Sequence, residues 1–579
     1  MSGSTRAGVR VARGWPGGRG VGGLLQSVPW AVVVVAGLGL VGVGVGVWSV
    51  MVGGIGWDTR HDLLLFAEVR RIVPAQGLAS AYDTVTRGGE FYGVLLLQAA
   101  ELARDVATGR PVRSGPDDPG TYLWLSWVTF TTGVLAAAAV GWAVARAVRS
   151  PLAGATAAAL LITTPLWLGM SVVNHKDLPV AAGLTLTSAA ISVATQRLRP
   201  ATLTLTALTA CLGGILTLGT RPGAVALLIA LTGATTGILA VAAWRLRTPR
   251  LLTWPAATSA LAVVAGLIGV WWTNPLGRTN LGQWLTDAVR NSGAFPFDGL
   301  IRTAGIDVRS TELPWWYVPA WLLAQAPLLT TALLLTTLIL ITLTIAQRIR
   351  SRRTPSNTPT GPTDEPIGLL PLTPFLVQST VLPTLIVASG AVLYDGIRHL
   401  LFIVPGLIAI TGLGIALLEH REIGHRLPGP RLAAITAITV VAASCWATTR
   451  WAPYSYAYIN PLAGATPNTA RATDEPAWEL DYWGATAREG LTRTKRACID
   501  AASRCAPFVI IYPESDTAEP YGGLNEDDQL LAGRTEYAIY EFWRGGSWDT
   551  QVPADTCTER VTIRRDAQTL GRGYLCQTK

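Results

Sequence analysis

Residues 223–243 read GAVALLIALTGATTGILAVAA, an apolar run without a charged side chain. A helix needs roughly 20 such residues to cross a bilayer, because the hydrocarbon core is about 30 Å thick and a helix rises about 1.5 Å per residue. Ten further segments are similar in length and composition. Together the predicted membrane spans cover residues 29–53, 122–145, 151–172, 179–195, 201–219, 223–243, 252–273, 317–346, 370–393, 399–418 and 432–449.

The overall composition agrees with these spans. Of the 579 residues, 50% are hydrophobic and only 14% are charged, and the mean hydropathy is +0.37. An ordinary soluble protein carries about 25% charged residues, so this class is excluded. The sequence predicts a polytopic α-helical protein of the cell membrane, with about eleven transmembrane helices surrounded by membrane lipids.

The arginines between the spans predict the orientation of the chain. The formal net charge is +9, but the basic residues form short clusters and no extended basic face, so nucleic acid is not indicated as a partner. Loops on the cytoplasmic side carry an excess of arginine and lysine. A cytoplasmic N-terminus places every cluster inside and, after eleven crossings, the C-terminus outside. The clusters are Arg146 and Arg149; Arg197 and Arg199; Arg245, Arg247 and Arg250; Arg348, Arg350, Arg352 and Arg353; and Arg421, Arg426 and Arg431.

This topology divides the chain into three parts, of which the first two are a cytoplasmic tail and the transmembrane domain. Residues 1–28 form a cytoplasmic tail, whose arginines resemble those of a signal peptide, although the following span is too long and lacks an A-x-A site, so we interpret it as retained. Residues 29–449 form the transmembrane domain, with long extracytoplasmic loops at 54–121 and 274–316. The first loop is predicted to contain two amphipathic stretches, an interfacial helix from Leu63 to Val73 and a second stretch from Tyr92 to Ala103. The cytoplasmic loop 347–368 is rich in Pro, Thr and Ser and is predicted to be disordered.

The extracytoplasmic region 450–579 is predicted to be a small α/β module with disulfides. It contains Cys498, Cys505, Cys557 and Cys576, and cysteines in an oxidising compartment favour disulfides. Three pairings are open, of which we favour the two local ones; a zinc site is disfavoured because the spacings are not CxxC-like and no histidine lies nearby. Residues 508–512 read FVIIY and predict a strand. The module either recognises an acceptor or acts as a stabilising cap.

Asp58, His61 and Asp62 follow the first span, where a carboxylate at the water boundary can meet a lipid-borne substrate. Such an acid can act as a general base that takes a proton from an acceptor hydroxyl. The alternative is a solvated loop acid with no chemical role. The sequence alone leaves both interpretations open for Asp58 and Asp62.

A second polar cluster, Asn174-His175-Lys176-Asp177, lies between two apolar spans. Lys176 is the only lysine before residue 495, and a lysine on the outer side opposes the usual charge bias. A cation beside a carboxylate can bind a phosphate and orient a second polar group. The alternative is a lysine whose ammonium group reaches the membrane interface without a further function.

The turn Tyr394-Asp395-Gly396-Ile397-Arg398-His399 is the third outward-facing polar group. Arg398 can hold a phosphate with two hydrogen bonds and His399 can add another. The alternative is a structural pair between Arg398 and Asp395. Arg221, at a helix junction, is a weaker phosphate-binding candidate. Because these turns lie on one side of the membrane, we hypothesise that they share one site for an anionic lipid.

At these residues the chain resembles the GT-C superfamily of polyprenyl-phosphate-sugar-dependent glycosyltransferases. The similar branch contains glycosyltransferase family 39, with the protein O-mannosyltransferases and the lipid A aminoarabinose transferases. The matching stretches, in shared order over roughly residues 25 to 495, are Trp57-Asp58, Asn174-His175-Lys176-Asp177-Leu178-Pro179, Leu313-Pro314-Trp315-Trp316-Tyr317-Val318-Pro319, Arg398-His399-Leu400-Leu401-Phe402 with Pro405, and Asp481-Tyr482-Trp483-Gly484.

The resemblance implies a polyprenyl-phosphate-linked sugar donor, an extracytoplasmic acceptor and inversion at the anomeric carbon. Asp58 would be the general base and Asp177 a second catalytic carboxylate. Lys176, Arg398 and His399, with Arg221 as a further candidate, would neutralise the leaving phosphate. Thr59 replaces the second acid of the family motif, which weakens a metal assignment, so a divalent cation stays open as a cofactor and no metal ligand is assigned.

Two other classes of function remain at this stage. A lipid or polysaccharide transporter also places polar groups between apolar helices, but we expect no inverted repeat and no broken helix. A non-catalytic envelope assembly protein would use the C-terminal region. No Walker sequence occurs in the chain, so ATP-driven transport has no visible energy source. The sequence does not identify the sugar or the acceptor.

Overall fold

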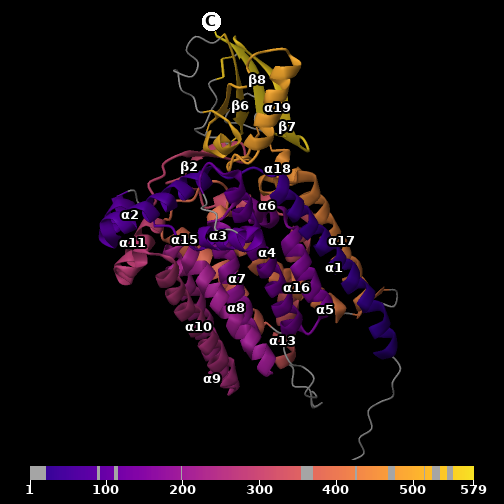
Figure 1. Ribbon diagram of the computed structural model, residues 1–579. Helices are drawn as coiled ribbons and strands as arrows, with labels where there is room; N and C mark the ends of the chain where they lie inside the picture. The colour runs from indigo at the N-terminus through magenta and orange to yellow at the C-terminus, as the bar shows by residue number, and fades with distance from the viewer. Residues whose placement is uncertain are drawn as a thin grey trace, which may run out of the picture.

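A computed structural model describes residues 21–578 with gaps at 88–90, 110–114, 197–198, 354–368, 421, 424–426, 467–475, 514, 525–534, 544–551 and 554. The predicted tail up to residue 20, most of loop 347–368, and Arg197, Arg421 and Arg426 lie outside these described residues. Figure 1 shows a bundle of long helices with a small sheet at one end.

The protein is a polytopic helical membrane protein. Within the described ranges, nine helices are long and apolar enough to cross a membrane, or ten if one bent pair forms a single span. The uninterrupted long helices are α1 (Val21–Val52), α4 (Pro119–Val148), α7 (Asp177–Ala194), α8 (Pro200–Thr220), α9 (Val225–Leu246), α10 (Arg250–Thr273), α13 (Leu328–Arg353) and α17 (Gly429–Trp451).

Four predicted spans differ from single straight helices, and two of them are divided into two helices. The span expected at 151–172 consists of α5 (Pro151–Thr163) and α6 (Pro165–Val173), bent by 56° at Thr164. The expectation of no broken helix was therefore wrong here; Pro165 lacks the N–H that would continue α5 and its ring disfavours the preceding helical turn. The span expected at 317–346 is likewise divided before Leu328, into α12 (Tyr317–Gln325) and α13.

The remaining two spans are shorter or irregular. The ninth long segment, Leu370–Ala388, contains α14 (Thr373–Leu376), a π-helical turn at Val377–Val381 and α15 (Leu382–Ala388). The segment expected at 399–418 forms α16 (Ile403–Glu419), an apolar helix below the usual spanning length. Each of the eleven predicted apolar segments is thus helical, with these interruptions.

Helix α7 is the centre of the bundle, because every one of its residues is buried. It packs against α4, α8 and α10. Close contact with α8 depends on glycine: a Cβ added at Gly183 would lie 2.6 Å from the carbonyl oxygen of Gly213. This packing fixes the start of α7, and therefore the preceding turn at residues 174–176, within the protein.

The extramembrane helices lie at the same end of the bundle as the C-terminal sheet (Figure 1). They are α2 (Trp57–Arg87), α3 (Leu95–Thr108) and α11 (Leu281–Gly293). The two predicted amphipathic stretches of loop 54–121 correspond to α2 and α3. A hairpin of β1 (Leu300–Thr303) and β2 (Ile306–Arg309) lies in the second long loop, and β3 (Glu422–Ile423) pairs with β4 (Leu427–Pro428).

The C-terminal region contains the short helix α18 (Pro461–Gly464), helix α19 (Ala487–Asp500) and a four-stranded mixed sheet. The strand order is β5-β6-β8-β7, with β5 parallel to β6 and the other pairs antiparallel. The strands are β5 (Val509–Tyr512), β6 (Glu536–Phe542), β7 (Cys557–Arg565) and β8 (Gln568–Gln577), so the predicted strand is confirmed.

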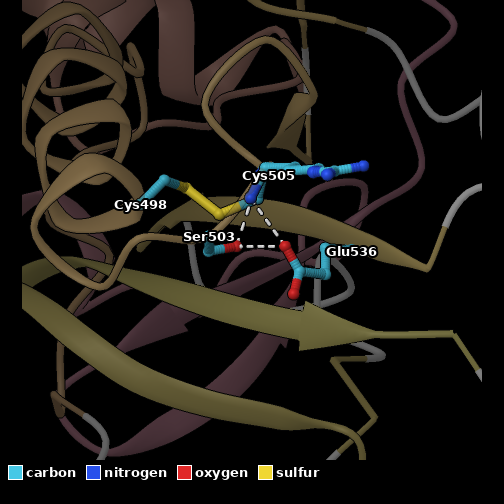
Figure 2. Close-up of a disulfide and its surroundings, with 5 residues drawn as sticks. Cys498, Ser503, Cys505 and Glu536 are labelled. Atoms are coloured by element: carbon cyan, nitrogen blue, oxygen red, sulfur yellow. Dashed lines mark hydrogen bonds between the residues drawn. A yellow bond between two sulfur atoms is a disulfide. The ribbon is translucent and has the colours of Figure 1, made fainter.

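Both disulfides of this module follow the local pairing that the sequence favours. Cys498 at the end of α19 bonds to Cys505, and Cys557 on β7 bonds to Cys576 on β8. Figure 2 shows Glu536 beside the first disulfide, where its carboxylate accepts a hydrogen bond from Ser503. This contact joins the loop after α19 to the start of β6. Disulfides are consistent with an extracytoplasmic module.

Candidate active site

The three polar turns predicted from the sequence meet in one cluster at the end of the bundle that carries the C-terminal module. The first residues of α2 supply Asp58 and Asp62, the turn before α7 supplies Lys176, and the turn before α16 supplies Arg398. Nζ of Lys176 lies 3.4 Å from Oδ2 of Asp58, and Nη1 of Arg398 lies 3.6 Å from the same oxygen. The three turns that we hypothesised to share one site are therefore in contact with one another.

Lys176 is buried, and its ammonium group lies inside the cluster. Its Nζ atom lies 2.9 Å from Oδ1 of Asp62 and 4.1 Å from the ring centroid of Tyr92. Burial lowers the pKa of Lys176, but the carboxylates of Asp58 and Asp62 raise it more, so its pKa lies above the ordinary value. The ammonium group therefore stays charged at neutral pH and pairs with carboxylates inside the protein.

Asp62 is held from two sides. Besides Lys176, Nε2 of His175 lies 2.7 Å from Oδ2 of Asp62. Burial raises the pKa of this carboxyl, but Lys176 and His175 more than offset the effect, and the pKa falls below its ordinary value. Asp62 is thus an ionised counter-charge inside the protein. His61, in contrast, is exposed.

Asp177 begins α7, and its position is set by a local turn. The side-chain oxygen of Asn174 accepts hydrogen bonds from the backbone N–H groups of Lys176 and Asp177, at 3.1 and 2.7 Å. Asparagine favours this kind of turn because its side chain imitates a backbone carbonyl. Asn174 also donates to Oδ2 of Asp177 at 3.0 Å. The other oxygen of Asp177 lies 2.9 Å from Nη2 of Arg221.

Arg398 connects this pair to the third turn. Its Nη2 atom lies 3.0 Å from Asp395, and its Nη1 atom lies 3.7 Å from Asp177. The structural pair between Arg398 and Asp395 therefore exists, together with contacts to the other acids. The turn is tight: Asp395 and Gly396 have φ values of 55° and 68°, a left-handed conformation that few side chains adopt without cost.

Several buried donors of the cluster lack hydrogen-bond partners within the described parts of the chain. They are Nε and Nη1 of Arg398 and Nε of Arg221. A buried donor without an acceptor costs about 1–3 kcal/mol, more when it is charged. Such atoms indicate where the oxygens of an anionic ligand can bind.

His399 lies beside the cluster with a partly buried ring. The ring packs edge-on against Tyr394, with 4.7 Å between centroids. Burial and the charge of Arg398 lower the pKa of His399 well below its ordinary value. The imidazole is therefore neutral at pH 7, so it can form a hydrogen bond with a ligand but does not add a positive charge.

The cluster contains three cations and four carboxylates. The carboxylates differ in access: the side chain of Asp58 is 27% exposed, whereas those of Asp62, Asp177 and Asp395 are exposed by 7%, 4% and 2%. Of the four acids, Asp58 is the most accessible to solvent. The described residues contain no group of three or more His, Cys, Asp or Glu side chains placed to hold a metal ion.

An apolar cavity leads to the cluster. It measures about 240 Å³ and lies between α2, α3 and the turn at 274–276. Leu65, Phe66 and Leu97 line its apolar part, while Asp62 and Lys176 lie at its polar end. A larger cavity of about 670 Å³ lies between α12 and α15. The site thus combines charged groups with room for hydrocarbon.

Sequence reasoning missed three aromatic side chains that cover the cations. Tyr92 lies over Lys176, while Tyr394 and Trp483 lie over the guanidinium of Arg398 at 4.6 and 4.8 Å. Tyr394 and Trp483 belong to stretches that the sequence singles out, and Tyr92 starts a predicted amphipathic stretch. Their contacts with the cations are tertiary, so no local pattern indicates them.

No protein-family model matches the chain, and no curated protein matches it. Among solved structures, the chain is similar to ArnT from Cupriavidus metallidurans bound to undecaprenyl phosphate, with a TM-score of 0.39, 12% identity, and coverage of 86% of this chain and 98% of that chain. It is also similar to the Archaeoglobus fulgidus oligosaccharyltransferase tethered with an acceptor peptide, with a TM-score of 0.36 and 14% identity over 75% of this chain and 54% of that chain.

Proposed function

We propose that the protein is an inverting membrane glycosyltransferase of the GT-C type, which moves a sugar from a polyprenyl-phosphate-linked donor to an extracytoplasmic acceptor. The observation that carries the proposal is the accessible carboxylate Asp58 beside Lys176 and Arg398, with Lys176 at the polar end of an apolar cavity. A sugar linked to a lipid phosphate requires a base, fixed cations and room for a hydrocarbon chain, and the cluster provides all three.

The proposed reaction has one transfer step. An acceptor hydroxyl attacks the anomeric carbon, its proton passes to the carboxylate of Asp58, and a new glycosidic bond forms. The bond between the anomeric carbon and the phosphate oxygen breaks, and its electron pair leaves with the lipid phosphate. Attack on the face opposite the phosphate inverts the anomeric carbon. The donor itself holds the required free energy, which suits a chain without a Walker sequence.

The leaving phosphate gains negative charge, so the role of the cations is electrostatic. The Nε and Nη1 atoms of Arg398, which lack hydrogen-bond partners within the described residues, can donate two hydrogen bonds to phosphate oxygens, and Lys176 adds a charge. Arg221 contacts Asp177 and contributes from the far side of that carboxylate. On this proposal Asp177 orients the arginines and lies near the reacting groups.

The cavity between α2 and α3 supports a lipid donor. Its wall is formed by leucine, valine and phenylalanine side chains, and Lys176 lies at its polar end. Burying a methylene group of an isoprenyl chain in such a cavity contributes about 0.8 kcal/mol. We propose that the first isoprene units bind here and bring the phosphate to Lys176.

A transporter is less well supported. Within the described residues, Lys176, Arg221 and Arg398 all contact the carboxylates of one cluster instead of being spread along the bundle. The bend between α5 and α6 is a broken helix of the kind found in transporters. Here it leads into the turn at 174–176, so it also explains how Lys176 reaches the cluster.

The decisive test compares envelope glycans and glycoproteins, by mass spectrometry, in cells with and without the gene. Complementation with Asp58→Asn should fail to restore the missing sugar. The matched control is Glu68→Gln, which changes an acid 47% exposed on the same helix and should restore it. Full complementation by Asp58→Asn would contradict the proposed base.

A further inference from the structure

The turn Asp481-Tyr482-Trp483-Gly484 precedes α19 and is buried throughout. It belongs to the C-terminal region but lies against the charged cluster. Within the described residues, none of its side chains forms an ion pair with Lys176, Arg221 or Arg398. Its relation to the site is through Trp483.

Trp483 contacts both Arg398, the proposed phosphate-binding residue, and the start of the helix that carries Asp58, the proposed base. Its ring lies under the guanidinium of Arg398, with 4.8 Å between the guanidinium carbon and the ring centroid. Its backbone carbonyl accepts a hydrogen bond of 3.0 Å from the N–H of Trp57, the first residue of α2. The next residue is Asp58. One residue therefore holds the arginine through its ring and the start of the helix that carries Asp58 through its backbone.

The chain before Asp58 fits closely against this turn. A Cβ added at Gly56 would lie 2.7 Å from the ring of Trp483, and one added at Gly54 would lie 2.1 Å from the carbonyl oxygen of Ala485. Both distances are shorter than real Cβ contacts. The two glycines thus allow the backbone to approach Trp483, and any displacement of the ring would be transmitted to α2.

The turn is itself anchored by Asp481. The buried carboxylate of Asp481 accepts hydrogen bonds from the hydroxyls of Tyr456 and Thr486 and from the backbone N–H of Ala485. Thr486 in turn accepts from the hydroxyl of Tyr540 on β6. The sheet of the C-terminal module is thereby connected to the turn by a continuous hydrogen-bond network.

The indole N–H of Trp483 has no hydrogen-bond partner within the described residues, although the side chain is completely buried. The orientation of the ring therefore depends on the backbone of the turn and on packing. This makes the Asp481 network the part of the structure that determines where the ring lies.

We propose that Trp483 is a positioning residue, which sets the distance between Arg398 and Asp58, and that the C-terminal module acts on the site through the Asp481 turn. This inference rests on the proposed function. It assigns the module a role in the geometry of transfer, in addition to any stabilising effect or acceptor contact.

The first experiment measures sugar transfer from a prenyl-phosphate-linked donor by the full-length protein in nanodiscs. Trp483→Leu keeps an apolar side chain but removes the aromatic face, and it should lower kcat by about 10-fold or more, since a cation–π contact in a desolvated site contributes about as much as a tenfold change. Trp483→Phe keeps a ring and should retain most of the activity. Equal kcat for Trp483→Leu and the wild type would overturn the proposal.

A double-mutant cycle separates positioning from general stability. If Trp483 acts through Arg398, Trp483→Leu should have little further effect on kcat in an Arg398→Gln background, because the two changes remove one interaction. Additive losses would mean that the tryptophan acts elsewhere and would contradict the proposal. Thermal unfolding of each variant shows whether it is folded.

A matched pair of tyrosines tests the network without touching Trp483. Tyr456→Phe removes the hydroxyl that donates to Asp481, whereas Tyr454→Phe removes a hydroxyl that donates to Glu489 at 2.6 Å. Both tyrosines are buried at the same junction. We expect a several-fold lower kcat for Tyr456→Phe and a normal kcat for Tyr454→Phe, with similar losses of thermal stability. Equal kcat values for the two variants would count against the network.

Failure of this inference is distinguishable from failure of the proposed function. If the wild-type protein neither transfers sugar nor binds undecaprenyl phosphate, the proposed function is wrong and the inference falls with it. If the wild type transfers sugar and Trp483→Leu matches it, only the positioning role is wrong.

Discussion

Lys176 and Asp62 form a buried ion pair, with 2.9 Å between Nζ and Oδ1. The two side chains are exposed by only 6% and 7%. Asp62 therefore holds the lysine in place, while Asp58, on the same helix, keeps access to solvent. The pair suggests that Asp58 and Asp62 have different roles, which the sequence alone did not distinguish.

The first prediction follows from this difference. Asp62→Asn should raise the KM for the donor by on the order of 10-fold, because Lys176 loses the nearer of its two carboxylate partners and shifts away from the phosphate. Asp58→Asn should lower kcat severely with little effect on donor binding, since its proposed task is proton removal. Steady-state kinetics and a separate donor-binding measurement check both. An unchanged KM for Asp62→Asn with a normal kcat would contradict the assignment.

The second prediction concerns the phosphate-binding cations. Lys176→Ala or Arg398→Ala should reduce transfer by about 10- to 1000-fold, corresponding to loss of a charge-assisted contact of about 1.5–3 kcal/mol or somewhat more. Arg398→Lys should restore activity only in part, because an ammonium group cannot form the bidentate contact of a guanidinium. Arg290→Ala on α11, where the arginine is 79% exposed, is the control and should transfer at the normal rate.

The third prediction concerns pH. Burial raises the pKa of Asp481 to about 7, although hydrogen bonds from Thr486 and Tyr456 act in the opposite direction. An unfolded aspartate has a pKa of about 3.9, so between these values the folded state binds the proton more tightly. The stability contributed by this group is therefore lost as the pH rises from about 4 to about 7. Thermal unfolding in detergent should show this decline, and Asp481→Asn should weaken it.

The fourth prediction concerns the cysteines. The structure contains two disulfides and two free cysteines, Cys211 and Cys445. Alkylation of the denatured protein should label two thiols without reduction and six after it, as mass spectrometry of the labelled protein would show. Labelling of Cys498 or Cys557 without reduction would mean that the module is reduced in its own compartment.

The fifth prediction is topological. Tags at residues 360 and 425 should be cytoplasmic, and a tag after residue 579 should be outside, because the arginine clusters favour the cytoplasmic side. Both internal positions lie outside the described residues, so this prediction rests on the sequence. Protease digestion of intact spheroplasts should remove only the C-terminal tag. Cleavage at residue 360 would mean that the orientation in the membrane is opposite to the predicted one.

The sequence predicts the apolar segments well, because length and composition decide whether a helix can cross a membrane. It also identifies the turns that carry Asp58, Lys176 and Arg398, since charges between apolar spans are rare. The bend at Thr164 was missed although Pro165 is visible, because the apolar composition continues across the break. Helix breaks of this kind leave hydropathy unchanged.

The contacts within the site could not be predicted. Asp62 and Lys176 are far apart in the chain, and no local pattern tells which carboxylate meets which cation. The sequence suggests that these cations bind a phosphate. In the structure, each of Lys176, Arg221 and Arg398 lies beside a carboxylate. The role of Trp483 is equally hidden, because a ring over a guanidinium depends on tertiary packing.

The near balance of three cations and four carboxylates has a consequence for selectivity. A site with little net charge does not draw dissolved anions from the medium, so inorganic phosphate and sulfate gain little by entering it. A phosphate carried on a hydrocarbon chain is held at the membrane surface, where its local concentration is high, and it can compete for the arginine donors with the resident carboxylates. On the proposed function, the paired charges would let the protein discriminate lipid-borne phosphates from the free ions of a changing external medium.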